Sequence, residues 1–474
     1  MARVVKLLRS PAFYMAVGFG VSGLSGSVFL IIINVAFAPD GHPVVMLNNG
    51  LNVLLATISA GVMAGLEQEM IRSVSRSLVR GSSPVKAVRR QVRQAAWLIS
   101  VSLAVTAALS PLLVRHWLGG DWVLFAELMV GLCASLASFQ VRGMLAGQED
   151  FLSYAASMIV EGIVRLVPGV VLLILGCHTV GWYGLLFALA PAGAAITGLV
   201  LPRLLGRPPL GHGIVEGGQE IPDDESSQRA AANLFLLTGA TLASQLLLNA
   251  VPLIVGVRYQ QSTGALAREA AAIASAVGLT RLGILILVPL QAPLLPRLTA
   301  AATRGDMREV RRRTLWLVGV CLAAGAVMLL VTGTIGPWVL THVMHALAPL
   351  PAWFLVALSL GTLFIMLGFV LQAALIALSR HTSVMIGWCL GVATTVPMLT
   401  AGGNPLHVIA LAAVVGPAVT AIFLAADCWW SSRAGAALAA APASESTDGD
   451  APDAADADAA AVVIEVQVDS PRLS

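Results

Sequence analysis

One arginine lies deep within a long apolar stretch of the sequence. Arg281 is the only ionisable residue between Ile273 and Gln291, and nine uncharged residues separate it from that glutamine. A charged side chain near the centre of a bilayer costs roughly 3 kcal/mol or more unless it faces protein or water. Because a guanidinium can bind a phosphate through two parallel hydrogen bonds, Arg281 is a candidate anion-binding residue. The alternative is a structural ion pair with a carboxylate on a neighbouring helix.

A second charged set occurs in the first half of the chain. Glu161 and Arg165 are four residues apart, with the order and spacing that favour an ion pair on one helix face. Such a pair neutralises itself in lipid, which favours a structural role over a substrate contact, although both residues stay candidates. Arg142 is predicted to end a helix on the cytoplasmic side, where it either anchors the helix or contacts an anion. Glu127 is expected at headgroup level and Glu67 on a solvated rim.

Five amide side chains accompany these charges in segments that are otherwise apolar. Gln245 and Asn249 are four residues apart and therefore share one helix face. The other three are Asn34, Gln291 and Gln372. Amides inside a membrane can hydrogen-bond helices to one another, or they can line a polar cavity that holds sugar hydroxyls. The sequence does not separate these two roles.

No arrangement of residues typical of catalysis occurs in the sequence. The nucleotide-binding glycine-rich loop and the nucleophilic serine motif of hydrolases are both missing. Of the eight histidines, His342 and His345 are the closest pair, and no carboxylate is near them in the sequence. The five cysteines lack the paired spacing of a metal or redox site. We therefore expect no enzyme activity, no metal and no cofactor.

The composition excludes a soluble globular protein. Hydrophobic residues make up 57% of the chain and charged residues only 11%, and the mean hydropathy is +0.85. Soluble domains carry about 25% charged residues, so the surface of this chain must face lipid. Tyrosine is scarce, whereas Ala, Val, Leu and Gly are abundant. These features favour helices that pack through small residues over a membrane β-barrel.

About twelve segments have the roughly 20 apolar residues that a membrane-spanning helix needs. Cytoplasmic loops of membrane proteins are enriched in Arg and Lys. With the N-terminus inside, the predicted cytoplasmic segments hold 21 such residues, and the opposite loops hold 3 (Arg115, Arg258 and Arg268). The sequence thus predicts a multi-pass protein of the bacterial inner membrane with both termini cytoplasmic. The predicted spans are 11–33, 46–66, 95–114, 122–142, 153–176, 181–201, 231–256, 272–294, 314–335, 351–378, 383–400 and 405–428.

The chain is predicted to form two six-helix bundles. Residues 1–205 make the N-terminal bundle and 229–433 the C-terminal one. A Gly- and acid-rich cytoplasmic linker, 206–228, joins them, and 434–474 is expected to be a disordered acidic cytoplasmic tail. Six helices return the chain to the same side of the membrane, so the halves are parallel repeats about an axis along the membrane normal. Such repeats place a cavity between the halves.

Two pairs of segments support the repeat. Val88–Gln91 and Val310–Arg313 each follow a basic loop and lead into a helix. Residues 142–153 and 372–383 each close an even-numbered helix. The predicted fold is therefore an all-α membrane protein with about twelve transmembrane helices in two six-helix, parallel-repeat bundles.

Three stretches resemble the polysaccharide-flippase branch of the MOP superfamily, a superfamily that also contains the MATE exporters and the lipid II flippases. They are Gly278 to Leu298 with Arg281 inside, Arg142 to Arg165, and Gly65 to Arg72. The likeness covers roughly residues 10–430. Members often carry an Arg-x-Leu-Gly-Pro-like stretch after the first helix. Here that stretch is Asn34–Asp40, and its basic residue is missing.

The resemblance implies a flippase. It would move an undecaprenyl-pyrophosphate-linked oligosaccharide, or a similar lipid-linked glycan, to the outer leaflet by alternating access. The arginines would contact the pyrophosphate (Arg281, Arg165 and Arg142), and the other polar residues would line the cavity (Glu161, Gln245, Asn249, Gln291, Gln372 and Asn34). The implied partners are the lipid-linked glycan, membrane lipids and glycan-assembly enzymes, with no nucleic acid.

Two alternatives stay open. A MATE-like exporter of small molecules or drugs shares the fold, but it calls for a carboxylate inside the membrane. Here Glu161 is offset by Arg165, and Arg281 would repel a cation. The other alternative is a non-transporting scaffold in cell-envelope assembly, for which the acidic tail could bind partners.

Overall fold

The computed structural model describes residues 11–38, 41–79, 84–206, 227–259, 262–284, 298, 306–378, 380–399 and 402–440. Within these ranges the chain is helical apart from short connections and contains no strand. The N-terminal half comprises α2 (Pro11–Ala36), α3 (His42–Val44), the π-helical η1 (Val45–Asn52), α4 (Val53–Val79), α5 (Pro84–Ala108), α6 (Ser110–His116), α7 (Trp122–Gly147), α8 (Phe151–Ile174) and α9 (Val180–Leu204).

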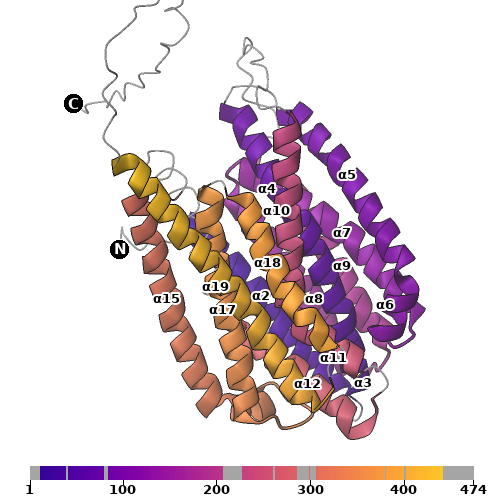
Figure 1. Cartoon of the computed structure of the whole chain (residues 1–474). Coiled ribbons are helices and arrows are strands. Elements are labelled where there is room, and N and C mark those ends of the chain that lie inside the picture. The colour runs from indigo at the N-terminus through magenta and orange to yellow at the C-terminus, as the bar shows by residue number, and fades with distance from the viewer. Residues whose placement is uncertain are drawn as a thin grey trace, which may run out of the picture.

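The C-terminal half follows in the same pattern. It comprises α10 (Ser227–Leu248), α11 (Ala250–Arg258), α12 (Gly264–Thr280), α15 (Met307–Thr334), α16 (Gly336–Trp338), η2 (Val339–Val343), α17 (Ala352–Ala377), α18 (His381–Thr395), η3 (Val396–Leu399) and α19 (Pro405–Ala440). The helices run side by side, with α15, α17 and α19 on one side of the bundle and α5, α7 and α9 on the other (Figure 1).

Many of the helices are long and apolar enough to cross a membrane. Eight described helices meet this condition alone, and the bent pairs α5 with α6 (63°) and α10 with α11 (56°) raise the number to ten. Two shorter helices, α12 with 17 residues and α18 with 15, lie where the sequence predicts the remaining spans. Large apolar side chains such as Ile174 (77% exposed) and Phe235 (72%) cover the outside, as lipid contact requires. The prediction of an all-α membrane protein is confirmed.

The same helix pairs pack together in both halves. The first helix of each half contacts the fifth, α2 with α8 and α10 with α18. The fourth contacts the sixth, α7 with α9 and α17 with α19, and the fifth contacts the sixth, α8 with α9 and α18 with α19. The parallel repeat predicted from the sequence is therefore present in the packing. The linker at 207–226 and the tail at 441–474 lie outside the described residues, and α19 continues to Ala440, past the predicted start of the tail.

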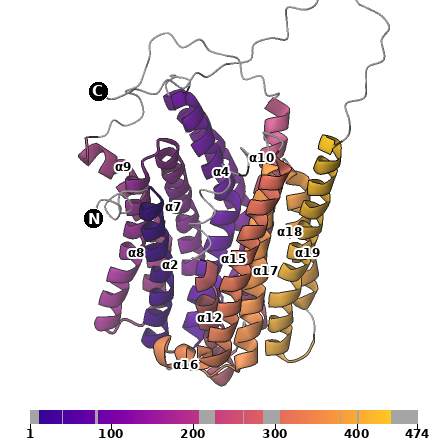
Figure 2. The ribbon, with the colours of Figure 1, turned by 90° about the vertical axis from the view of Figure 1, so that its left-hand side faces the viewer.

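Hydrogen bonds join the two halves near one end of the bundle, and α4 packs against α10 beyond them. The upper end of the bundle is the one where α2 begins and α19 ends (Figure 2). At the opposite, lower end, α3, α11 and α12 meet (Figure 1). At this lower end the Nε1 of Trp117, just after α6, donates to the carbonyl of Leu253 in α11 at 3.0 Å. The Nδ2 of Asn49 in η1 reaches the carbonyl of Ala270 in α12 at 3.5 Å. Further along, Thr241 of α10 donates to the carbonyl of Gly61 in α4 at 2.9 Å.

A substitution at Gly256 tests whether the lower end is a gate. A Cβ there would lie 2.2 Å from Cδ1 of Trp117, so Gly256→Ala must displace the indole and its hydrogen bond to Leu253. We expect the lower end to open. The measurement is the distance between spin labels at Gly120 and Ser262, in a chain whose five native cysteines are replaced.

Gly402→Ala is the matched control, because a Cβ at that position meets open space. The distance should lengthen in Gly256→Ala and stay at the wild-type value in Gly402→Ala. An unchanged distance in both variants would contradict a gate at Trp117.

Candidate functional site

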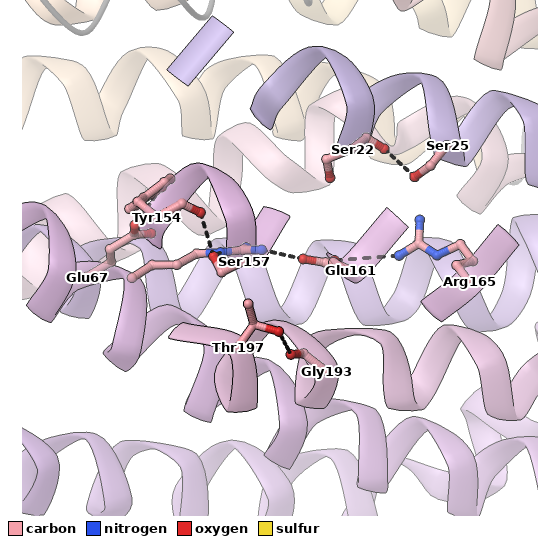
Figure 3. Close-up of polar contacts among 10 residues, drawn as sticks. Ser22, Ser25, Glu67, Tyr154, Ser157, Glu161, Arg165, Gly193 and Thr197 are labelled. Carbon is pink, nitrogen blue, oxygen red and sulfur yellow. Dashed lines mark hydrogen bonds and ion pairs between the residues drawn. The ribbon is translucent and has the colours of Figure 1, made fainter. Parts of the chain in front are cut away.

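Two arginines share one glutamate inside the N-terminal half. Arg142 of α7 donates through its Nη2 to Oε2 of Glu161 in α8 and through its Nε to Oγ of Ser157 at 3.3 Å. Arg165, one turn along α8, approaches the other oxygen of Glu161 at 3.6 Å. Figure 3 shows Ser157, Glu161 and Arg165 in a row along one helix. The predicted pair of Glu161 and Arg165 is therefore present, but Arg142 makes it a triad with two cations and one anion.

The position of Arg142 corrects an expectation from the sequence. Arg142 was expected at the cytoplasmic end of its helix, but α7 continues to Gly147, and the side chain of Arg142 is buried. The next helix begins only after Asp150, whose carboxylate accepts from the backbone and hydroxyl of Ser153. This short, capped connection turns α8 back against α7, which brings Arg142 beside Ser157 and Glu161.

Glu67 extends the cluster from α4. Its Oε1 accepts from the hydroxyl of Tyr154 at 3.0 Å, and Tyr154 also offers its carbonyl to the hydroxyl of Ser157 at 2.6 Å. In Figure 3, Glu67 and Tyr154 lie at one end of the row that Arg165 closes at the other. Glu67 is therefore not on a freely solvated rim, because α4 packs against α7 and the carboxylate is half-buried beside Tyr154 of α8. Tyr154 and Ser157 lie in the stretch from Arg142 to Arg165 that resembles the polysaccharide flippases, but neither was predicted as a site residue.

Small residues of α2 leave room for this cluster. A Cβ at Gly18 would touch the Cα of Ala155 at 3.0 Å, and one at Gly26 would lie 3.9 Å from Nη1 of Arg165. On the other side, the guanidinium carbon of Arg165 lies 5.4 Å from the ring centroid of Phe187, a cation–π contact. Close helix packing and an aromatic face therefore surround the second cation of the triad.

Arg281 lies in the C-terminal half at the point where α10 bends into α11. Its Nη1 donates to Oδ1 of Asn249 at 3.0 Å, and its Nη2 donates to the carbonyl of Leu248. That carbonyl has no helical donor because the residue four positions later is Pro252, which lacks an N–H, and the chain bends by 56° between α10 and α11. No carboxylate among the described residues pairs with Arg281. Its charge is therefore met by neutral oxygen atoms.

Arg281 also lies close to the seam between the halves. One turn before it on α12, a Cβ at Gly278 would be 3.4 Å from Cδ2 of Leu30 in α2. A further turn back, Oγ of Ser275 accepts from Nδ2 of Asn34, which also donates to the carbonyl of Met344 at 3.0 Å. Helix α12 therefore packs against α2 up to the turn that precedes Arg281.

The candidate amides differ in their surroundings. Asn34 is fully buried and joins the two halves through Ser275. Gln372 accepts from Nε1 of Trp388 at 2.6 Å, which ties α17 to α18. Gln245 lies one turn before Asn249 on α10, and Gln291 is outside the described residues. Asn34 and Gln372 make the contacts expected of amides that hold helices together, and their role as substrate contacts stays a prediction.

Glu127 lies in the second turn of α7 and is buried within the protein, and its expected place at headgroup level stays a prediction. A Cβ at Gly184 in α9 would be 2.0 Å from its Oε2, and one at Gly181 would be 3.5 Å from its Oε1. The Oε2 atom has no hydrogen-bond partner among the described residues. The glycines of α9 let α7 approach closely enough to enclose the carboxyl group.

The arrangement favours an anion over a cation. With Glu67, the N-terminal cluster holds two guanidinium groups and two carboxylates, so its charges are matched, whereas Arg281 adds a cation that no described carboxylate neutralises. Buried charges are costly when they lack a partner of opposite sign. A visiting phosphate could exchange with the neutral oxygen atoms around Arg281 and strengthen its hydrogen bonds.

No family model matches the chain. It is 28% identical to an uncharacterized protein of Mycobacterium tuberculosis over 339 residues, which cover 70% of this chain and 72% of that protein. It is 26% identical to an uncharacterized protein of Mycobacterium bovis over 380 residues, which cover 78% of this chain and 80% of that protein.

Solved structures resemble the chain over most of its length. An inward-facing multidrug resistance MATE family transporter of the MOP superfamily matches with a TM-score of 0.58 and 15% identity, covering 92% of this chain and 96% of that one. The Vibrio cholerae MATE transporter VcmN in its bent form matches with a TM-score of 0.58 and 16% identity, covering 91% and 98%. A MOP superfamily transporter from Pyrococcus furiosus, described by the reverse polarity of its binding pocket, matches with a TM-score of 0.54 and 15% identity, covering 92% of this chain and 98% of that one. The chain therefore has the twelve-helix fold of the MATE transporters of the MOP superfamily.

Proposed function

We propose that this protein is a membrane transporter that moves a lipid-linked oligosaccharide of the undecaprenyl-pyrophosphate type across the bacterial inner membrane by alternating access. The observation that carries the proposal is Arg281. Its guanidinium lies beside the bend between α10 and α11, one turn beyond the contact of α12 with α2, and no described carboxylate neutralises it.

The geometry supports an anionic substrate that is too polar to cross lipid unaided. The head of a lipid-linked glycan cannot cross about 30 Å of hydrocarbon without a polar path. Two repeats that rock about a common seam provide such a path. Arg281 donates to an amide oxygen and a main-chain carbonyl, both neutral acceptors that a pyrophosphate can displace.

The N-terminal half supplies two further arginines. Arg142 and Arg165 converge on Glu161, and Glu67 joins the cluster through Tyr154, so two guanidinium groups face two carboxylates and the preference for an anion rests on Arg281. The amides of Gln245 and Asn249 are of the kind that exchange hydrogen bonds with sugar hydroxyls. Enzymes that assemble the glycan are the partners this proposal predicts.

Reconstitution tests the proposal directly. Purified protein is placed in proteoliposomes with a fluorescent undecaprenyl-pyrophosphate oligosaccharide, and quenching from outside reports the fraction of the lipid in each leaflet. We expect protein-dependent movement between leaflets, competed by unlabelled lipid-linked glycan. Proteoliposomes that do not exceed protein-free vesicles would overturn the proposal.

The fold likeness to multidrug MATE transporters favours one alternative, the export of a cationic small molecule. The same vesicles can be loaded with ethidium under a proton or sodium gradient. Efflux of ethidium without movement of the glycan lipid would favour the exporter. Failure of both assays would favour a scaffold in cell-envelope assembly.

A further inference from the structure

An apolar groove lies on the outer side of the C-terminal half. Helices α15, α17 and α19 form its walls, and its volume is about 340 Å³. Apolar side chains line most of it, among them Val310, Val318, Leu367, Leu371 and Ile422. Its size falls within the roughly 300–1,000 Å³ of known small-molecule sites. We call this feature the α15–α19 groove.

The groove has the length of one leaflet. Along α15 it extends from Met307 to Val318, which corresponds to about 16 Å at 1.5 Å per residue. That is close to half of the roughly 30 Å hydrocarbon core of a bilayer. Helix α15 begins, and α17 and α19 end, at the upper end of the bundle in Figure 2, so the groove runs from that end toward the centre.

One end of the groove is basic and aromatic. The guanidinium carbon of Arg311 lies 5.0 Å from the ring centroid of Trp429, and both residues line the groove. The neighbouring Arg312 and Arg313 are held by Glu309 at 2.7 and 2.6 Å. Arg380 and Asp427, which do not line the groove, neutralise each other at 2.6 Å. Arg311 pairs with no described carboxylate, so its charge remains for a ligand.

The groove is separate from the seam between the halves. The seam is formed by α4 against α10 and by α2 and η1 against α12, whereas α15 and α19 lie on the far side of the C-terminal half (Figure 1). A lipid in the groove is therefore surrounded by one half only, and its binding does not depend on the transport proposal.

We propose that the α15–α19 groove binds an anionic phospholipid of the leaflet at the upper end. One acyl chain fills the apolar walls, and the phosphate contacts Arg311 while the indole of Trp429 lies at headgroup depth. Aromatic rings favour this depth, and each arginine near an anionic headgroup strengthens binding by about fivefold.

Native mass spectrometry of the full-length protein in detergent tests the headgroup contact. We expect dioleoyl-phosphatidylglycerol to bind more tightly than dioleoyl-phosphatidylcholine, which has the same chains without net charge. Arg311→Gln should weaken the binding of phosphatidylglycerol by about fivefold and leave the binding of phosphatidylcholine unchanged. The control is Arg312→Gln, because Arg312 is exposed, held by Glu309 and absent from the groove wall.

A second pair of variants tests the chain contact. Ala425 lines the groove and Ala426, its neighbour on α19, does not. The larger side chain in the Ala425→Phe variant should fill the groove and abolish lipid binding. The Ala426→Phe variant should bind the lipid with the wild-type affinity. Equal binding of the two lipids, or unchanged lipid binding by the Ala425→Phe variant, would overturn the proposal. If inorganic phosphate alone bound as tightly as phosphatidylglycerol and lost affinity equally in Arg311→Gln, the site would bind a free anion and the proposal would also fall.

Discussion

Replacing Arg281 with alanine is expected to abolish movement of the glycan lipid in proteoliposomes while the protein still inserts and folds. Removing one partner of a buried, charge-assisted contact costs about 2 kcal/mol or more, which corresponds to at least about thirtyfold in rate or affinity. Arg281→Lys keeps the charge but loses the planar fork, so we expect intermediate activity. The readout is the initial rate of leaflet exchange, normalised to the amount of reconstituted protein.

A structural role for Arg281 makes a different prediction. If the guanidinium only closes the bend between α10 and α11, its loss would free the carbonyl of Leu248 and lower the unfolding temperature. A glutamine at 281 could still donate to that carbonyl, so Arg281→Gln would then restore both stability and transport. In the anion-site role, Arg281→Gln restores stability alone, because the positive charge is gone.

An exposed arginine provides the control for the loss of charge. Arg380 is partly exposed and pairs with Asp427 at 2.6 Å, away from the seam. Proteoliposomes with the Arg380→Ala variant should exchange the glycan lipid between leaflets at the wild-type rate. Exchange at the wild-type rate in Arg281→Ala as well would remove Arg281 from the proposed substrate path.

Helix positions could be predicted from the sequence because lipid imposes a simple rule. Every span must be long, apolar and internally hydrogen-bonded, and each predicted span overlaps a helix in the part of the chain that the structure describes. The ends were less predictable. Helix α7 runs five residues past Arg142, because Gly143 and Gly147 pack against Met70 and Val74 of α4 and continue the helix contact.

Contacts between distant segments could not be predicted. Tyr154 donates to Glu67, 87 positions away, and Asn34 donates to Ser275, 241 positions away. Sequence spacing identifies neighbours on one helix, as for Glu161 and Arg165, but it does not say which helix faces which. The bend that places the carbonyl of Leu248 beside Arg281 does have a signal in the sequence, because Pro252, four residues later, has no N–H to donate to that carbonyl and its ring crowds it. What the sequence does not say is that Arg281 is the residue that meets the freed carbonyl.

Glu161→Ala is expected to destabilise the protein strongly. The change leaves Arg142 and Arg165 without their shared carboxylate, in a region where both guanidinium groups are buried. Breaking a buried pair by removing one partner costs about 3–5 kcal/mol, because the remaining charge is uncompensated. The measurement is the unfolding temperature in detergent, followed by intrinsic tryptophan fluorescence. Glu161→Gln keeps an acceptor oxygen without the charge and should fall between alanine and the wild type.

The chain contains a matched control for this prediction. Glu309 also lies four residues before an arginine and pairs with two of them, Arg312 and Arg313, but Arg312 is 78% exposed and water screens the group. Glu309→Ala should therefore change the unfolding temperature far less than Glu161→Ala.

If the two variants unfold at the same temperature, the triad does not stabilise the N-terminal half. A triple variant, Glu161→Ala with Arg142→Met and Arg165→Met, replaces the buried ions with apolar side chains, those of methionine being similar in length to arginine. If its unfolding temperature returns toward the wild-type value, the drop seen in Glu161→Ala comes from uncompensated charge and not from a cavity.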